Sequence, residues 1–310
     1  MVTSQMLMRV APLVFVVLWS TGFIGSRLGA PDAEPFTFLS LRFLLVLGLL
    51  LPVALFFQQR AGGWHERGHA IVVGALIHGF YLGGVFWAIH REMPAGVAAL
   101  IVSLQPIMTS VLAGPLLGER VSAQNWFGLA IGLVGAILIL APKFDLATSA
   151  GTGINGYTIL ASVIALCAIT MGTLYQKRFA TRIDLLVGAV WQYIGALIIV
   201  SAGALLFETR EVNWTPNFIF ALAWLVLVLS IGAISLLMLL IRQNAVATVA
   251  GLFYLVPGVT ALIAHFMFGE TLDLMQIFGL VLATFAVLLT TLRKENLRFL
   301  QRRRPAPPAP

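Results

Sequence analysis

Ten blocks of apolar residues follow one another along the chain, separated by short connections that carry charged residues, glycine or proline. Each block is about 20 residues long, the length that an α-helix needs to cross the hydrocarbon core of a bilayer. The pattern predicts an all-α membrane protein with ten transmembrane helices and no soluble domain between them. The expected spans are residues 10–29, 36–57, 69–90, 94–116, 124–141, 156–176, 184–207, 217–241, 246–268 and 273–291.

The chain contains an internal repeat. Residues 104–140 align with residues 255–291 without a gap, at an offset of 151 positions, the difference between Pro257 and Pro106. A paired mid-helix proline and a paired Gly-Glu are hard to obtain by chance, so we infer a duplication. Its period differs from the roughly 20–50 residues of a solenoid repeat. The matched residues include Gly118-Glu119 with Gly269-Glu270 and Phe127-Gly128-Leu129 with Phe278-Gly279-Leu280.

Five spans in each half is an odd number, so the second half must lie inverted relative to the first. Two inverted five-helix repeats are the architecture of many secondary transporters. The expected domains are a first five-helix repeat at residues 1–142, a linker at 143–156, a second five-helix repeat at 157–292, and a basic, Pro-rich cytoplasmic tail at 293–310.

Composition and charge support a membrane location and suggest an orientation. Hydrophobic residues make up 60% of the chain and charged residues 10%, against roughly 45–50% and 25% in soluble domains. Basic residues of the connections fall 14 to 4 between the two sides, which places both termini in the cytoplasm of a bacterial inner membrane. The net charge of +7 therefore reflects topology and lipid contact, not a nucleic-acid partner. The single Cys167 excludes an intrachain disulfide.

Polar and aromatic side chains near the middle of the predicted spans are the candidates for a substrate site. Polar groups at this depth must be satisfied by protein, water or a ligand, although packing is the alternative interpretation for each. The candidate substrate-binding residues are Trp19, His78, Tyr81, Gln105, Thr109, Trp224, Tyr254 and Thr260. Further polar candidates in the second half are Thr170, Thr173, Trp191, Gln192 and Ser235.

Pro106 and Pro257 are the expected hinges. Proline removes a backbone donor and displaces the carbonyl group four residues earlier, that of Val102 or Phe253. A displaced carbonyl group in hydrocarbon survives only where protein or a wet cavity satisfies it. Prolines at matched positions of opposed halves therefore indicate a shared cavity near the midplane, with a simple packing kink as the alternative.

Arg42 is the only Lys, Arg, Asp or Glu well inside a predicted span. One interpretation is that its side chain snorkels outward, to Asp32 or Glu34. The other is a possible charge site that faces the substrate. His78 is the only deeply placed group that titrates near neutrality, and without a partner it should stay neutral. The sequence thus predicts gradient-driven export without obligatory proton exchange, or at most weak coupling through His78. Coupling through a water chain or through a group at a span end, such as Glu119 or Glu270, is the alternative.

The last span of each half is predicted to serve packing. Ser122 and Asp273 correspond at the same offset and are good N-caps for these two spans. Small residues that face each other let two helices approach closely. The expected seam consists of Gly128, Gly132 and Gly135 against Gly279, Ala283 and Ala286.

These features together resemble the EamA-type branch of the drug/metabolite transporter superfamily. Each half closes with a proline-bearing helix, a Gly-Glu turn and a Phe-Gly-Leu helix start, and Trp19-Ser-Thr-Gly-Phe and Arg42-Phe are similar to the family's first two helices. The resemblance covers about residues 12–291. It implies a basket of ten helices that exports amino acids or other small metabolites. It does not transfer a substrate, because members handle amino acids, amphiphilic drugs and other metabolites.

We therefore predict an exporter that works by alternating access through a central cavity. Aromatic or apolar amino acids are the first expected substrates, because the candidate wall is aromatic and amide-bearing; amphiphilic drugs or other metabolites are the alternative. A non-transporting membrane sensor or assembly protein is the alternative of another class. The sequence lacks HExxH, GxSxG and Walker motifs, so we expect no enzyme, cofactor or metal site. The expected partners are a small-molecule substrate and membrane lipid, and the protein is expected to be a monomer.

Overall fold

The computed structural model describes residues 2–56, 63–91, 93, 98, 101–141, 153–244, 246–268 and 273–291. Within these ranges the regular elements are helices, apart from one isolated bridge between Ala33 and Val212. The predicted all-α class is confirmed. The tail at 293–310 and most of the predicted linker lie outside the described residues, so the domain limits stay a prediction.

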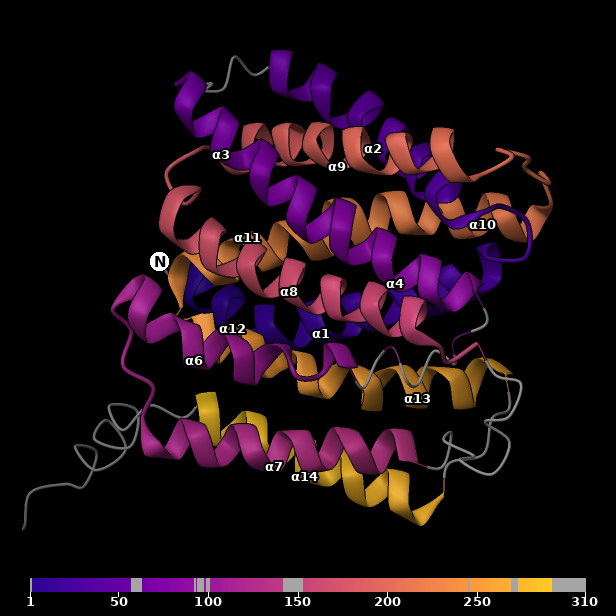
Figure 1. Cartoon of the computed structure of the whole chain (residues 1–310). Coiled ribbons are helices and arrows are strands. Elements are labelled where there is room, and N and C mark those ends of the chain that lie inside the picture. Colours follow the sequence, from indigo (N-terminus) through magenta and orange to yellow (C-terminus); the bar gives the residue numbers. More distant parts are fainter. Residues whose placement is uncertain are drawn as a thin grey trace, which may run out of the picture.

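The helices run along one another in a single bundle (Figure 1). Those of the first half are α1 (Val2–Gly29), α2 (Pro35–Phe56), α3 (Trp64–Gly74), η1 (Ala75–Phe80), α4 (Tyr81–His90), α6 (Gln105–Leu117) and α7 (Ala123–Leu140). Those of the second half are α8 (Gly156–Phe179), α9 (Leu185–Phe207), α10 (Pro216–Trp224), η4 (Leu225–Ala233), α11 (Ile234–Gln243), α12 (Val246–Gly251), η5 (Leu252–Leu255), α13 (Val256–Phe268) and α14 (Leu274–Thr291).

Seven helical segments of the described chain are long and apolar enough to cross a membrane. Two shorter apolar segments, Val10–Ser26 and Leu274–Leu289, belong to the first and the last described helix. The predicted span at 94–116 lies partly outside the described residues, although its second part forms α6. The count of ten spans therefore stays a prediction.

Contacts between the two halves come in pairs that the offset of 151 positions relates. Helix α2 packs on α9, and α7 packs on α14. Helix α6 packs on α8, and its counterpart α13 packs on α1. The continuous helical column formed by α3, η1 and α4 packs on α8 and α9. Its counterpart, the column formed by α10, η4 and α11, packs on α1, and η4 also packs on α2. The main hydrophobic core accordingly contains residues of both halves.

Two of the described spans, Trp64–His90 and Pro216–Gln243, each contain a π-helical segment. The first segment, η1, covers residues 75–80, and the offset of 151 positions maps it onto residues 226–231, inside η4. A π-helical turn carries an extra residue and is often found at functional sites. The sequence pattern did not predict either segment, because it records only the apolar character of the span.

The last helices of the two halves, α7 and α14, run side by side in opposite directions at one edge of the bundle (Figure 1). A Cβ on Gly135 would lie 2.8 Å from the backbone oxygen of Gly279, so the two backbones touch where the small-residue seam was predicted. Both predicted N-caps are confirmed. Ser122 Oγ accepts from the Asn125 amide at 3.2 Å, and Asp273 Oδ1 accepts from the Gln276 amide at 2.8 Å.

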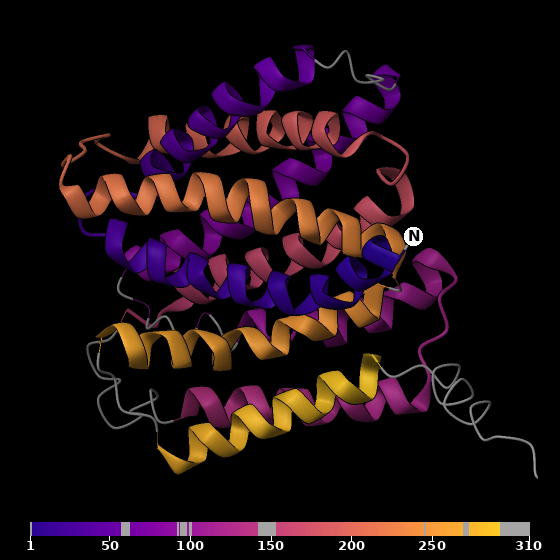
Figure 2. The ribbon, with the colours of Figure 1, turned by 180° about the vertical axis from the view of Figure 1, so that it is seen from behind.

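The view from behind shows that α1 begins and α14 ends at the same end of the bundle (Figure 2). At the opposite end, the connection after α1 meets the connection after α9. Glu208 accepts hydrogen bonds there from the amides of Phe36 and Thr37, at 2.7 and 2.6 Å, and thereby caps the N-terminus of α2. Glu34 accepts from the backbone and side chain of Thr209, at 2.7 and 2.8 Å.

Candidate functional site

Close backbone contact positions His78 against the second half. Gly74, at the end of α3, lies so near α9 that an added Cβ would meet the Gln192 carbonyl oxygen at 1.8 Å. Gly195 approaches the Ile71 carbonyl oxygen in the same way, at 2.1 Å. Only glycine permits this approach. The first turn of η1 is therefore held directly on α9.

His78 lies in a buried aromatic environment. Its ring stacks on Tyr193 of α9, with centroids 5.2 Å apart and planes 18° apart. The ring of Phe43 lies 6.3 Å from His78 and 5.5 Å from Tyr193. His78 is 2% exposed. The Gln192 side chain lies within hydrogen-bonding reach of His78, but neither His78 Nε2 nor Gln192 Oε1 has a well-formed hydrogen bond among the described residues.

Arg42 is completely buried in the same region. Its Nε donates to the Ser230 hydroxyl of η4 at 2.8 Å, and the Tyr193 hydroxyl donates to the Ser230 carbonyl oxygen at 2.6 Å. The idea that Arg42 snorkels to Asp32 or Glu34 is wrong. Those carboxylates bind Thr215 and Thr209 of the connections instead. We call the residues Arg42, His78, Gln192, Tyr193 and Ser230 the Arg42 cluster.

A second group of candidates joins α1 to the broken helix of the second half. Trp19 packs on Phe15 and on Phe253 of η5, with ring centroids 5.3 and 5.2 Å apart. Thr260 donates to the Ser20 carbonyl oxygen at 3.5 Å. Trp224 of α10 is half-buried and donates from Nε1 to the Thr21 hydroxyl at 3.1 Å. This group is mainly aromatic.

The two prolines are placed alike, but not as kinks inside a continuous helix. Pro106 is the second residue of α6 and Pro257 the second residue of α13. Each therefore occupies a position where a missing N–H costs little. In the second half the carbonyl of Phe253 accepts from the Val256 amide in a 3₁₀ turn. Protein backbone thus satisfies this carbonyl group, the first of the two expected possibilities, and the shared cavity stays a prediction.

The remaining candidates are buried in separate places. Gln105 donates from Nε2 to the Thr109 hydroxyl at 3.2 Å, one turn along α6, while its Oε1 atom has no partner in the described part of the chain. Tyr81 is 5% exposed and belongs to the main core. Tyr254 lies against α7, with its ring over Gly132, and no described residue binds its hydroxyl. The structure thus brings His78 and Arg42 together, places Trp19 and Thr260 both where α1 meets the second half, and places Tyr254 with the packing helices.

Sequence reasoning missed Tyr193 and Ser230 as site residues. The repeat held a signal for Tyr193, because the offset of 151 positions maps Arg42 onto it. Helices α2 and α9 pack on each other, and in an inverted repeat equivalent helices meet at the axis between the halves. Ser230 corresponds to Gly79 and carries no comparable signal.

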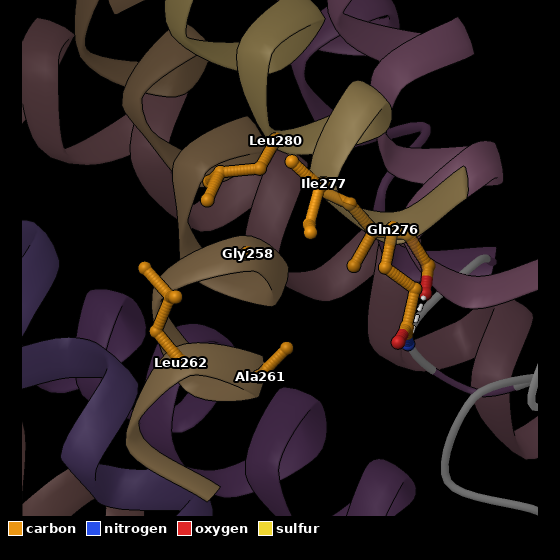
Figure 3. A pocket seen from close by; sticks show the side chains of 7 residues that line it. Gly258, Ala261, Leu262, Gln276, Ile277 and Leu280 are labelled. Carbon is orange, nitrogen blue, oxygen red and sulfur yellow. Dashed lines mark hydrogen bonds between the residues drawn. The ribbon is translucent and has the colours of Figure 1, made fainter. Parts of the chain in front are cut away.

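A small apolar crevice opens between α13 and α14 beside α7 (Figure 3). Its volume of about 20 Å³ is room for roughly one water molecule. No candidate substrate-binding residue lines it, and it is too small for a metabolite. It is lined by Ile139, Gly258, Ala261, Leu262, Gln276, Ile277 and Leu280.

The Gly-Glu turn of the first half reaches into the second. Gly118 ends α6 with a φ of 70°, a left-handed conformation that favours glycine. The following Glu119 accepts from the Val246 amide at 3.1 Å and caps the N-terminus of α12. Lys177 of α8 donates to the carbonyl oxygens of Ile241 and Asn244, each at 2.8 Å, at the end of α11. The helix ends at this side of the bundle are thus joined by charged side chains.

Comparison with known proteins places these features in a family. The model of the EamA-like transporter family matches residues 8–141 and residues 156–292. The chain belongs to the EamA-like transporter family. It is a membrane transporter, and the resemblance noted from the repeated motifs is confirmed.

Several bacterial proteins are similar to this EamA-like transporter over most of its length. It is 27% identical over 280 residues to the Escherichia coli K12 protein named "Uncharacterized inner membrane transporter YedA", covering 90% of this chain and 88% of that one. It is 24% identical over 286 residues to an E. coli K12 protein named "Probable amino-acid metabolite efflux pump", covering 88% and 91%. A solved crystal structure matches with a TM-score of 0.76 and 19% identity, over 93% of this chain and 97% of that chain. That likeness shows the fold alone.

Proposed function

We propose that this transporter exports small metabolites, aromatic or apolar amino acids first, across a bacterial inner membrane by alternating access. In this proposal ten spans form two inverted five-helix repeats, both termini lie in the cytoplasm, and the chain acts as a monomer. One relative, 24% identical, is named a probable amino-acid metabolite efflux pump, and this name supports the substrate class.

The observation that carries the proposal is the placement of matched interruptions in matched spans. The π segments η1 and η4 fall at equivalent positions of the two halves, and helix breaks precede both Pro106 and Pro257. Interrupted helices at equivalent positions mark the midplane site in transporters built from inverted repeats. Each interrupted column packs on the other half. In this proposal a change at one interruption would move one half against the other.

The proposed substrate wall combines the Arg42 cluster with the aromatic group around Trp19. Helix η4 connects the two groups, because it carries Ser230 toward Arg42 and packs Leu229 on Gly22 of α1. Tyr81, Trp224, Gln105 and Thr109 are retained as further wall residues. In the described part of the chain no three His, Cys, Asp or Glu residues gather as they would around a metal ion.

Amphiphilic drug export is the second candidate, favoured by the aromatic group of Trp19, Phe15 and Phe253. That group contains no charged side chain and suits an apolar solute. A sensor or assembly protein without transport is the third. The first two candidates differ in the solute that they move, and the third moves none.

Counterflow in proteoliposomes tests the proposal. Purified protein is reconstituted with internal phenylalanine or leucine, and uptake of the labelled amino acid is followed with and without an imposed pH gradient. We expect saturable uptake that Trp19→Ala reduces and that Phe285→Ala, a change at a half-exposed aromatic residue of α14, leaves intact. Uptake of cationic dyes but of no amino acid would support drug export, and no saturable movement of any solute would reject transport by the purified chain. A pH gradient that drives amino acid uphill would reject export without proton exchange.

A further inference from the structure

The Arg42 guanidinium is a buried cation without a counterion among the residues that the structure describes. Arg42 is 1% exposed, and its one hydrogen bond to a described residue joins Nε to Ser230. An arginine carries five N–H donors, so four of them have no acceptor in the described chain. A charge buried at membrane depth is costly unless something pairs with it, and such residues generally mark substrate pathways.

Two further polar groups of the Arg42 cluster lie at the same place. Neither Nε2 of His78 nor Oε1 of Gln192 has a well-formed hydrogen bond among the described residues, although the two side chains lie within hydrogen-bonding reach of each other. Each residue is 2% exposed. His78 also lies close enough to Arg42 for the two to interact electrostatically. The cluster therefore places an imidazole and an amide side chain beside the free guanidinium donors.

The polar groups that are satisfied hold the cluster in shape. Ser230 binds Nε of Arg42 through its hydroxyl, while Tyr193 binds the Ser230 backbone. Tyr193 in turn stacks on His78. These contacts hold the guanidinium through Nε and leave its two terminal nitrogens free for a ligand. The two terminal nitrogens form the edge that binds a carboxylate through two parallel hydrogen bonds.

We propose that Arg42 binds the carboxylate of the transported solute, with His78 Nε2 as a second contact. The substrates are then organic acids, α-amino acids among them, and not cationic amphiphiles. This inference rests on the proposed transport function. Among the described residues the cluster holds one fixed cation, which balances one negative charge; a phosphate monoester carries about −1.5 to −2 and would need another.

The site spans both halves of the transporter. Arg42 and His78 belong to α2 and η1 of the first half, whereas Gln192, Tyr193 and Ser230 belong to α9 and η4 of the second. A carboxylate bound here contacts both halves at once. Because the cluster is closed, entry requires η1 or η4 to move, and both of these segments are π-helical.

The first test compares matched ligands on the wild-type protein in detergent, where no transport is needed. Thermal unfolding is followed with phenylalanine, phenylalanine methyl ester and phenethylamine at equal ionic strength. We expect stabilisation by the acid at concentrations about tenfold or more below those needed for the ester or the amine, the discrimination that charge-assisted hydrogen bonds provide. Equal stabilisation by acid and ester would overturn the proposal. Stabilisation by chloride alone would also overturn it, because the site would then hold an inorganic anion.

The second test uses variants. Arg42→Gln should abolish the preference for acid over ester, and Arg42→Lys should restore part of it. Ser230→Ala, which removes the hydroxyl that holds Nε, should weaken acid binding while the charge remains. Arg91→Gln is the matched control, since Arg91 lies exposed over Trp87. If Arg42→Gln does not fold, Ser230→Ala and Arg42→Lys carry the test. A melting temperature that falls in Arg42→Gln with an unchanged acid-to-ester ratio would make Arg42 structural.

Counterflow separates this inference from the proposed function. Acid-selective stabilisation without any flux would reject transport and keep the carboxylate site. Flux that carries ester and acid equally well would keep transport and reject the site.

Discussion

At the scale of single residues, His78 is a buried polar group at a position where the other half has an apolar one. Its ring stacks on Tyr193, and among the described residues Nε2 has no well-formed hydrogen bond, with the Gln192 side chain as its polar neighbour. The equivalent position in the second half carries Leu229, so an apolar residue also suits this place in the fold. We therefore propose that His78 serves a ligand contact.

We expect His78→Leu to keep or raise stability, by up to about 1 kcal/mol, because it removes an unsatisfied buried group. Transport should fall by about tenfold, the loss of roughly 1.4 kcal/mol of binding. Thermal unfolding and counterflow measure the two effects. Tyr254→Phe is the matched control, since it removes an unpartnered hydroxyl beside α7. A less stable His78→Leu protein with normal transport per folded molecule would show that the histidine is structural.

Glu34 carries a pH-dependent contribution to stability at the end of the bundle where α2 begins. Burial by itself raises its pKa, but hydrogen bonds from Thr209 and from the Arg210 amide outweigh this and hold the pKa below its ordinary value. A lowered folded pKa means that the contribution is present above the unfolded pKa, about 4.3. It is lost as the pH falls through the folded pKa.

The expected outcome is that Glu34→Gln lowers the melting temperature at neutral pH and that the difference from wild type shrinks between about pH 5 and pH 3. Melting curves in detergent over this range measure it. Glu211→Gln, an exposed change in the connection after α9 that Glu34 binds, is the control and should show no such trend. A constant difference at all pH values would mean that shape, not charge, matters at position 34.

At the scale of elements, the pair α7 and α14 depends on the absence of side chains. A Cβ on Gly135 would lie 2.8 Å from backbone atoms of both Gly279 and Ala283. Backbone cannot yield as a flexible side chain can, so the helices would have to separate. Glycine at these positions therefore determines the distance between the two helices.

We predict that Gly135→Ala destabilises the protein by about 1–3 kcal/mol through overpacking. Gly48→Ala is the control, because Gly48 of α2 has open space around its Cβ position and gains helix propensity. Thermal unfolding of both variants decides the matter. Equal stability of the two variants would show that the α7 and α14 backbones adjust freely.

At the scale of the whole molecule, the halves form one core and not two. The column with η1 packs on α8 and α9, and the column with η4 packs on α1 and α2. Each half thus completes its hydrophobic contacts only with the other. The start of α1 and the end of α14 lie at one end of the bundle (Figure 2).

The orientation predicted from the basic residues is open to cysteine labelling. On a Cys167→Ala background, a membrane-impermeant thiol reagent added to intact cells should label Glu211→Cys, in the connection after α9. It should not label His65→Cys, at the start of α3, until the cells are opened. Both positions are exposed in the structure. Labelling of position 65 alone would reverse the orientation.

The sequence by itself determined the features that depend on local chemistry. Helical spans follow from runs of apolar residues, the N-caps at Ser122 and Asp273 from side chains that bind the next turn, and the family from motifs repeated at a fixed offset. The sequence also predicted the close approach of Gly135 to Gly279, because equivalent helices of the two halves each carry a row of small residues and these two rows can pack on each other.

Only the tertiary structure decided the partners of the buried polar groups. Arg42 binds Ser230, which lies 188 positions away in the chain, and not the carboxylates near its own helix start. The close approach of Gly74 to Gln192 likewise joins residues of opposite halves. Hydropathy reports the depth of a residue in the membrane, whereas the direction in which it faces is set by helices that are distant in sequence.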